Sequence, residues 1–268
     1  MSNQLLEYRS ALHLNGEVFL FNYKDEFAAF GVTDQYFDMF MKTVSTKHMI
    51  NGKTLIGLIP LLMIMQRQYR NAFQSISVFQ SYQSWVLLRP AIESALIMGK
   101  WLDDLSNFDV WKRHQDNWKN YQKIYQGKNL VSDSLPSSSD IQKVLKSIND
   151  DFMHTNPSYY KRHSQIIDLD KDTVGMFVNF TDDEQDHRAH VYAFLYLTIF
   201  ILKRVGEMLS DRYEEKGNFT VNLDKLHDHF VKNARQISAQ DEEYKKLLLE
   251  IGLWPNKSLQ PTAKDAAD

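Results

Sequence analysis

TDDEQDHRAHVYAFLYLTIFILKRVGEMLSDRY, residues 181–213, is the stretch that decides the fold. Thr181 stands three positions before Glu184, which is the sequence signature of a helix start. Mostly apolar residues then recur every three or four positions, the spacing of one face of an α-helix. The stripe consists of Val191, Phe194, Leu195, Thr198, Leu202, Val205 and Leu209. We therefore predict one long helix that runs to about Tyr213 and buries this face.

The rest of the chain favours helices as well. Only 10 Gly and 6 Pro occur in 268 residues, which leaves few tight turns for a many-stranded β fold. Short helices are expected in the first 50 residues, one of them capped by Thr33 or Asp34, and residues 157–180 read as irregular. Further helices are predicted at 53–79, 81–104, 107–126, 140–153, 223–237 and 241–251. The expected fold is an all-α bundle of about seven to nine helices with long antiparallel core helices.

One domain accounts for most of the chain. Residues 1–254 are predicted to form a single all-helical domain. The segment GKNLVSDSLPSSSD, residues 127–140, is a loop by composition and marks a weak internal boundary. Residues 255–268 carry no apolar periodicity and are expected to be a disordered tail.

Composition excludes several classes of protein. A net charge of −3 gives no general attraction to nucleic acid or anionic lipid, and we find no DNA-binding signal. The absence of cysteine excludes disulfides and thiolate sites and fits a cytoplasmic protein. The polar start predicts no signal peptide. Because apolar runs 55–65 and 191–202 are shorter than the roughly 20 residues of a membrane span, both are expected to be core helices.

The segment LLRPAIESALIMGKWLDD, residues 87–104, is the most unusual helix. Pro90 lies inside it and is predicted to kink or restart it. Four charged side chains fall within about 60° of one another around the helix axis: Arg89, Glu93, Lys100 and Asp104. Two interpretations stay open. The stripe is either a solvated edge with an Arg89–Glu93 pair, or a cleft-facing guanidinium that holds a phosphate or carboxylate.

The same segment carries a resemblance to a known family. LLRPAIE, the following Lys-Trp-Leu-Asp-Asp, and His154-Thr155-Asn156-Pro157 resemble a bacterial all-helical family described only as a domain of unknown function. The likeness covers roughly residues 55–210 and implies a bundle in which Arg89, Glu93 and His154 approach one another. Some members of that family are similar to the HEPN group of helical ribonucleases, toxins and phage-defence effectors.

The resemblance implies a function. A HEPN signature has an arginine and a histidine separated by four to six residues. No arginine of this chain fits it, and the nearest arrangement is Arg9 to His13, with three residues between. The expected catalytic residues are therefore a split set, with His154 as general base and Arg89 stabilising a charged phosphorane beside Glu93. We expect a cytoplasmic effector directed at RNA or a nucleotide and linked to stress or phage defence. Whether it is an enzyme stays open.

Aromatic and basic residues alternate in the predicted helix 107–126. Trp111, Trp118 and Tyr125 recur at seven-residue spacing beside basic side chains. The basic side chains are Lys112, Arg113, Lys119 and Lys123. Such a pattern can stack the bases of single-stranded RNA and neutralise its phosphates, although a packed helix with a solvated flank has the same pattern. Trp111, Trp118 and Lys100 are the predicted substrate-binding residues.

Alternatives of other classes remain. One is a non-catalytic helical module that binds a partner protein or a small anionic ligand in the same cleft, with a homodimer among its expected forms. Another is a metal-binding bundle around Glu184-x-x-His187-x-x-His190 or Asp224-x-x-His227, because a carboxylate and a histidine three apart share a helix face. Surface and capping histidines are the commoner case, so we predict no metal and no cofactor.

Overall fold

The chain folds as an all-α bundle, as predicted. The computed structural model describes residues 4–46, 57–153, 164–168, 173–178, 182, 184–210 and 223–229. Its helices are α1 (Gln4–Asn22), α2 (Lys24–Thr46), α3 (Leu58–Ser77), α4 (Ser81–Asp103), α5 (Ser106–Lys112), α6 (Trp118–Tyr125), α7 (Ser138–Phe152) and α9 (Glu184–Ser210). A 3₁₀ turn spans Gly127–Leu130, and residues 223–229 are helical. The predicted helices 223–237 and 241–251 otherwise lie outside the described residues, as does the tail 255–268.

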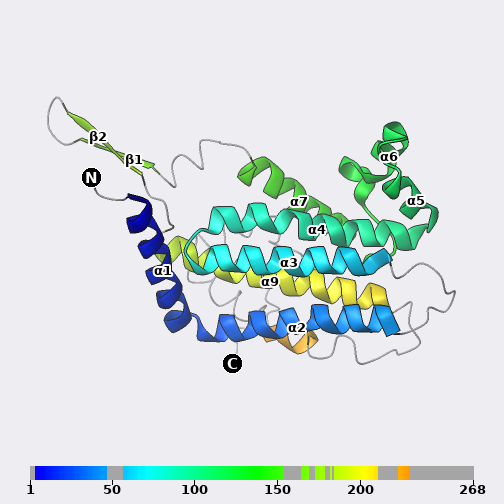
Figure 1. Ribbon diagram of the computed structural model, residues 1–268, viewed down its shortest axis with the longest axis horizontal. Helices are drawn as coiled ribbons and strands as arrows, with labels where there is room; N and C mark the ends of the chain where they lie inside the picture. The colour runs from blue at the N-terminus through cyan, green and yellow to red at the C-terminus, as the bar shows by residue number, and fades with distance from the viewer. Residues whose placement is uncertain are drawn as a thin grey trace, which may run out of the picture.

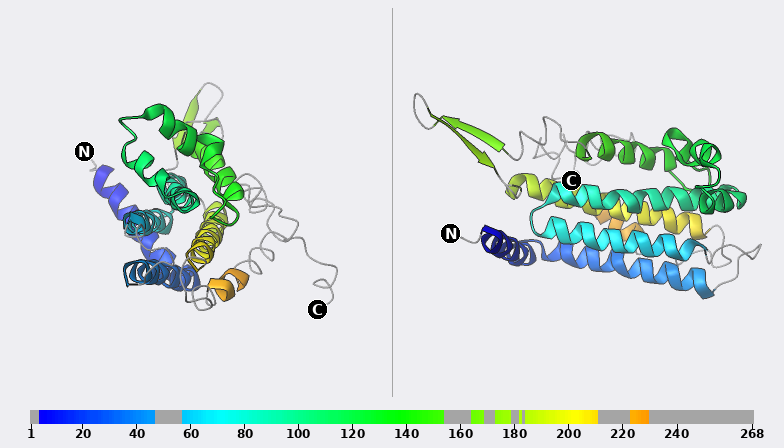
Figure 2. Two further views of the ribbon diagram at one scale, coloured as in Figure 1. Left: turned by 90° about the vertical axis from the view of Figure 1, so that its right-hand side faces the viewer. Right: turned by 45° about the horizontal axis from the view of Figure 1, so that its top comes forward.

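Four long helices build the bundle. α2, α3, α4 and α9 run side by side along the long axis of the molecule, and α7 covers the outer side of α4 (Figures 1 and 2). α1 crosses one end of the bundle, whereas α5 and α6 project from the other end (Figure 1). The two ends therefore present different surfaces, and the long helices separate them.

α9 is the central core helix. Its side chains that are fully buried include Phe194, Leu195, Leu197, Ile201 and Val205. Within the described residues, the segment His187–Ser210 is the one helix long and apolar enough to cross a membrane, but 83% of its most apolar stretch is buried inside the bundle. Burial of this kind is what a core helix of a globular fold needs, and it agrees with the expectation from the length of the apolar runs.

The turn between α3 and α4 is fixed by residues just before and within α9. Phe79 adopts φ 63°, a left-handed backbone conformation that side chains with a Cβ rarely take. The Asp182 backbone N–H donates to the Phe79 carbonyl at 2.9 Å, and the Asp182 carboxylate accepts from the Ser81 N–H at 2.8 Å. Asp182 thus satisfies one of the free N–H groups at the start of α4 and holds the strained turn in place.

Some predicted boundaries were wrong. Residues 4–46 form two long helices rather than several short ones, because the Thr33 hydroxyl donates to the Phe30 carbonyl inside α2 instead of capping a new helix. α4 runs through Pro90 as one helix from Ser81 to Asp103 and does not restart there. Part of the irregular segment 157–180 is a β-hairpin, in which β1 (Ser164–Asp168) pairs antiparallel with β2 (Val174–Val178).

The predicted helix 107–126 is divided in two. α5 ends at Lys112 and α6 begins at Trp118. Between them the Asn117 side chain accepts a hydrogen bond from the Asn120 N–H at 3.1 Å, which is the geometry of an N-cap. An asparagine side chain that satisfies a backbone donor in this way favours a new helix start over continuation.

Candidate functional site

Arg89 and Glu93 meet as the first interpretation of their spacing predicts. The Arg89 guanidinium contacts both Glu93 carboxylate oxygens, with Nη2 to Oε1 at 2.7 Å and Nη1 to Oε2 at 3.2 Å. Its Nε donates to the Asn149 side-chain oxygen on α7. The two charged side chains are 31% and 30% exposed, so the cluster sits at the rim of the α4–α7 contact. The Nε, Nη1 and Nη2 groups of Arg89 thus all have partners within the protein, as expected for a bidentate structural pair.

The environment of Glu93 shifts its protonation. Partial burial raises the pKa of Glu93, and the neighbouring Arg89 charge acts in the opposite direction. Burial also raises the pKa of Tyr121, and the negative charge of Glu93 adds to that rise. Glu93 on α4 therefore lies within electrostatic reach of Tyr121 on α6 and links the charged cluster to the aromatic one.

The third expected catalytic residue cannot be compared with these two. α7 ends at Phe152, and His154 lies outside the described residues. The meeting of Arg89 and Glu93 with His154 stays a prediction. Asn149, which sequence reasoning missed, takes the remaining position beside Arg89. Nothing in its local sequence distinguishes Asn149 from a solvent-facing polar residue of an amphipathic helix.

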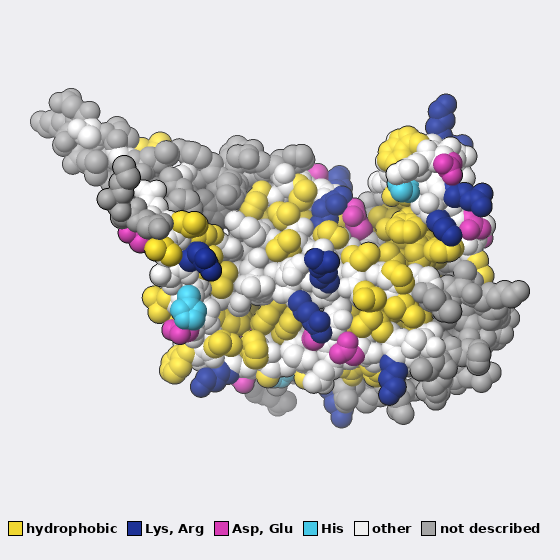
Figure 3. Space-filling view, in the orientation of Figure 1, with side chains coloured by type: hydrophobic (Ala, Val, Ile, Leu, Met, Phe, Trp, Pro, Cys, Tyr) yellow, Lys and Arg dark blue, Asp and Glu magenta, His cyan; other side chains and the backbone are white. Residues whose placement is uncertain are grey.

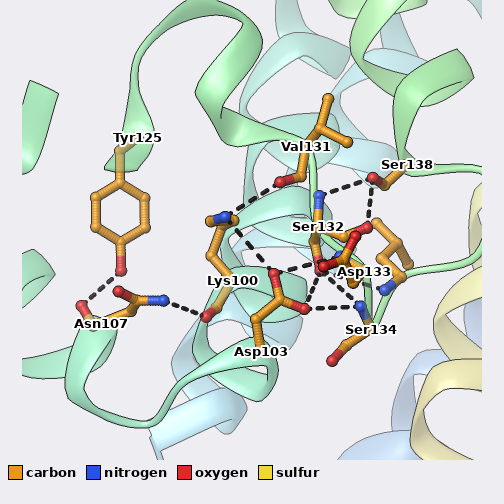
Figure 4. A network of polar contacts seen from close by, with 10 residues as sticks. Lys100, Asp103, Asn107, Tyr125, Val131, Ser132, Asp133, Ser134 and Ser138 are labelled. Carbon is orange, nitrogen blue, oxygen red and sulfur yellow. Dashed lines mark hydrogen bonds and ion pairs between the residues drawn. The ribbon is translucent and has the colours of Figure 1, made fainter. Parts of the chain in front are cut away.

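Lys100 has partners within the protein. Its ammonium group donates to the Val131 carbonyl at 3.2 Å and lies 3.6 Å from the Asp103 carboxylate (Figure 4). Asp103 in turn accepts from the Ser132 hydroxyl at 2.9 Å and from the Ser134 N–H at 2.7 Å. Burial raises the pKa of Asp103, but these hydrogen bonds outweigh it and hold the pKa below its ordinary value. The network ties the loop after α6 to the end of α4.

Close packing completes that attachment. A Cβ at Gly99 would lie 2.5 Å from the Ser132 hydroxyl oxygen and 2.9 Å from the Leu135 Cβ, so only glycine fits there. Asn107 and Tyr125 extend the polar network, since the Tyr125 hydroxyl donates to the Asn107 carbonyl (Figure 4). The loop 127–140 therefore packs directly on α4 in the part of the chain that the structure describes.

Trp111 and Trp118 have different surroundings. The Trp111 ring packs edge-on against the buried Trp101, with centroids 5.2 Å apart. Trp118 is 49% exposed and stacks on Tyr121 at 5.2 Å and 19°. Tyr121 stacks in turn on Tyr125 at 5.1 Å and 29°, so α6 carries a continuous ladder of three rings. The break before α6 separates Trp111 from this ladder and brings in Tyr121, a residue that the seven-residue spacing did not single out.

Exposed cations surround the ladder. Five basic residues and one acidic residue occur between positions 112 and 128, in a chain whose net charge is −3. The five are Lys112, Arg113, Lys119, Lys123 and Lys128, and all are exposed. In the described part of the chain none of them forms an ion pair. On this projection Figure 3 shows hydrophobic side chains with Lys and Arg, and also Asp and Glu, around them.

The histidines considered as metal ligands have other partners. His187 is fully buried, its Nε2 contacts the Ile76 carbonyl at 2.6 Å, and its ring stacks on Phe79. His190 accepts a hydrogen bond from the Trp85 indole at 2.9 Å through Nδ1. No group of three or more side chains able to ligate a metal occurs among the residues that the structure places. Both rings act as packing and hydrogen-bonding groups of the core.

Comparison with known proteins adds no relative. No family model, curated protein or solved structure matches this chain.

Proposed function

We propose that the chain is an RNA-binding helical protein, and that single-stranded RNA binds on α5 and α6. The α6 surface, as used below, consists of Trp118 and Tyr121 with the five cations between positions 112 and 128. The observation that carries the proposal is the exposed Trp118, stacked on the half-buried Tyr121. It lies beside five exposed cations that form no ion pair within the described residues, in a chain that is acidic overall. Single-stranded nucleic acid is the ligand whose recognition needs both features together.

Stacking gives the first contribution to binding. Trp118 stands at the free end of the ladder with about half of its surface exposed, so a base can continue the stack on it. Base stacking on an aromatic side chain contributes about 1–3 kcal/mol and tolerates every base, because each base has a π-face. Tyr121 and Tyr125 support the indole from behind and limit its rotamer freedom, which lowers the entropic cost of binding.

The cations give the second contribution. Each cation that neutralises a phosphate releases a counterion, so affinity falls as salt rises. If the five side chains of the α6 surface all contact phosphates, the slope of log K against log salt for a single strand approaches about −3.5. A slope near zero would mean that the cations take no part in binding.

The charged cluster on α4 supports binding rather than cleavage. The Arg89 guanidinium is already held by Glu93 and Asn149, whereas a group that stabilises a phosphorane must face the phosphate. We therefore assign Arg89 and Glu93 a structural role at the contact of α4 with α7. The role as an effector in stress or phage defence stays a proposal that rests on the resemblance to the helical family. Cleavage by Arg89 and His154 is an alternative that the test below distinguishes from binding.

The test measures anisotropy of a labelled single-stranded RNA of about 12 nucleotides, a length within the usual site size. Trp118→Ala is expected to weaken binding by about 1–3 kcal/mol and Lys123→Glu to weaken it and flatten the salt slope. Lys225→Glu is the matched control, because Lys225 is equally exposed but lies on the segment 223–229, away from α6 (Figure 1). Equal loss of affinity in Lys123→Glu and Lys225→Glu would refute the assignment.

Two further experiments identify the ligand and test for cleavage. Single-stranded DNA of the same sequence offers the same stacking and phosphate contacts but lacks the 2′-hydroxyl. Weaker binding of DNA would support RNA as the ligand, and equal binding would remove RNA from the proposal. The bound RNA is then analysed by denaturing gel. Intact RNA supports a binding protein, and cleavage that disappears in an Arg89→Ala, His154→Ala double variant would replace the proposal with the ribonuclease interpretation.

A further inference from the structure

α1 exposes large apolar side chains at the end of the molecule opposite α5 and α6. All residues from Gln4 to Ser10 are exposed, among them Leu5 at 66% and Leu6 at 57%. Later in the helix Leu14, Leu20 and Phe21 are 59%, 51% and 75% exposed. Helices in globular proteins gain most of their stability by burying an apolar face, and this helix leaves much of its apolar surface in contact with solvent.

A groove runs beside the second half of α1. Its volume is about 320 Å³, and it is open to solvent and mainly apolar. The side chains that form it include Leu12, Leu20, Phe27 and Val78, and Gly16 lets its floor come close to α1. Phe27 on α2 is 49% exposed at the edge. The same chain therefore presents both protruding apolar residues and a hollow of a size to receive them.

One face of α1 is complementary to itself. With His13 at the centre, the residues of this face are Leu6, Arg9, Ser10, His13, Gly16, Glu17 and Leu20. Suppose that a second copy of α1 lies antiparallel across this face, with a two-fold axis at His13. The residue numbers of each facing pair then add up to 26, twice the number of His13. Arg9 then faces Glu17, Leu6 faces Leu20, and Ser10 faces Gly16, which brings opposite charges together and pairs leucine with leucine.

We propose that α1 is the interface of a homodimer, in which two copies pair antiparallel about a two-fold axis at His13. Ser10 lies on this face, and its small side chain allows the helices to approach. Leu6 of each copy enters the groove of the other copy beside Leu20 and Phe27. An isologous contact of this kind closes on itself and gives a dimer rather than a fibre.

The exposed area is sufficient for a stable dimer. Leu6 and Leu20 lie on this face, Phe27 lies at the edge of the groove, and Leu5 and Phe21 lie at the edges of the face, each about half exposed or more. At roughly 100 Å² each, these five side chains offer roughly 500 Å² of apolar surface per copy. Polar side chains at the rim bring this near the 800 Å² or so per partner of a standard interface.

Sedimentation velocity over a range of concentrations tests the dimer. The unmodified chain is expected to be dimeric at about 10 µM, and Leu6→Glu to raise the dissociation constant by at least about tenfold. Met63→Glu is the matched control, because Met63 on α3 is also 57% exposed and lies outside the interface. Circular dichroism confirms that both variants keep their helices. A monomeric unmodified chain, or equal effects of the two variants, would overturn the proposal.

Charge reversal tests the register. Arg9→Glu and Glu17→Arg are each expected to weaken the dimer, because each places like charges opposite one another. The double variant with both substitutions restores the pairs and is expected to recover the dimer. His13→Cys in this cysteine-free chain is expected to oxidise to a disulfide-linked dimer, while Lys225→Cys stays monomeric under denaturing conditions. Failure of the double variant to recover would overturn the proposed register.

Discussion

Acid is expected to destabilise this protein through His187. The ring is fully buried among Phe19, Tyr23 and Phe79, with centroid distances of 5.9, 5.3 and 3.7 Å. Its Nε2 contacts the Ile76 carbonyl, and its Nδ1 has no partner within the described residues. Because the carbonyl must accept a hydrogen bond, the neutral ring carries its proton on Nε2. A second proton would place an unpaired charge among aromatic rings.

The magnitude follows from the two protonation states. Burial lowers the pKa of His187 to about 4, against 6.5 for the ordinary side chain, while the hydrogen bond to Ile76 acts in the opposite direction. Between these pH values the unfolded chain binds a proton that the folded chain does not. The contribution is therefore fully present above pH 6.5 and is lost as pH falls to about 4, which lowers the free energy of unfolding by about 3 kcal/mol.

Urea denaturation followed by circular dichroism at several pH values between about 7 and about 4.5 measures this loss. His187→Gln keeps a donor for the Ile76 carbonyl and cannot titrate, so its free energy of unfolding is expected to change less with pH. His229→Gln, an exposed histidine, is the control and is expected to keep the pH dependence of the unmodified chain. Parallel pH curves for the unmodified chain and His187→Gln would refute the reasoning.

Further predictions concern the attachments of α4. Gly99→Ala is expected to lower the free energy of unfolding by about 1–3 kcal/mol, because the new Cβ would overlap Ser132. Gly31→Ala, which meets nothing within 4 Å inside α2, is expected to raise it by about 1 kcal/mol, and chemical denaturation compares the two. Asp182→Ala removes the acceptor for the Ser81 N–H and is expected to lower the free energy of unfolding by about 1 kcal/mol. No measurable change in thermal unfolding would contradict the capping role.

The fold could be predicted further than the site. The apolar stripe of residues 191–209 predicts α9, and the bounds of α4 agree with the prediction to one residue. The break before α6 was not predictable from periodicity, because Trp111, Trp118 and Tyr125 keep helical spacing across it. Its cause is a local competition, in which the Asn117 side chain caps a new helix.

For the site, proximity along one helix was predictable and proximity between helices was not. The Arg89–Glu93 contact follows from their spacing of four residues, and the structure has it. The contact of Arg89 with Asn149 depends on how α7 crosses α4, which no spacing encodes. The position of Lys100 also could not be predicted from spacing along the helix. It shares the helical stripe with Arg89, yet the loop after α6 covers it and gives it Val131 as a partner.

Ultraviolet crosslinking followed by mass spectrometry tests the central claim most directly. Single-stranded RNA is bound to the full chain, irradiated and digested, and the peptides that carry nucleotide adducts are identified. Binding on the α6 surface predicts adducts within residues 111–128, with Trp118 the principal site and fewer adducts as salt rises. Adducts confined to other segments, or none under conditions in which the RNA is bound, would contradict the assignment of this surface.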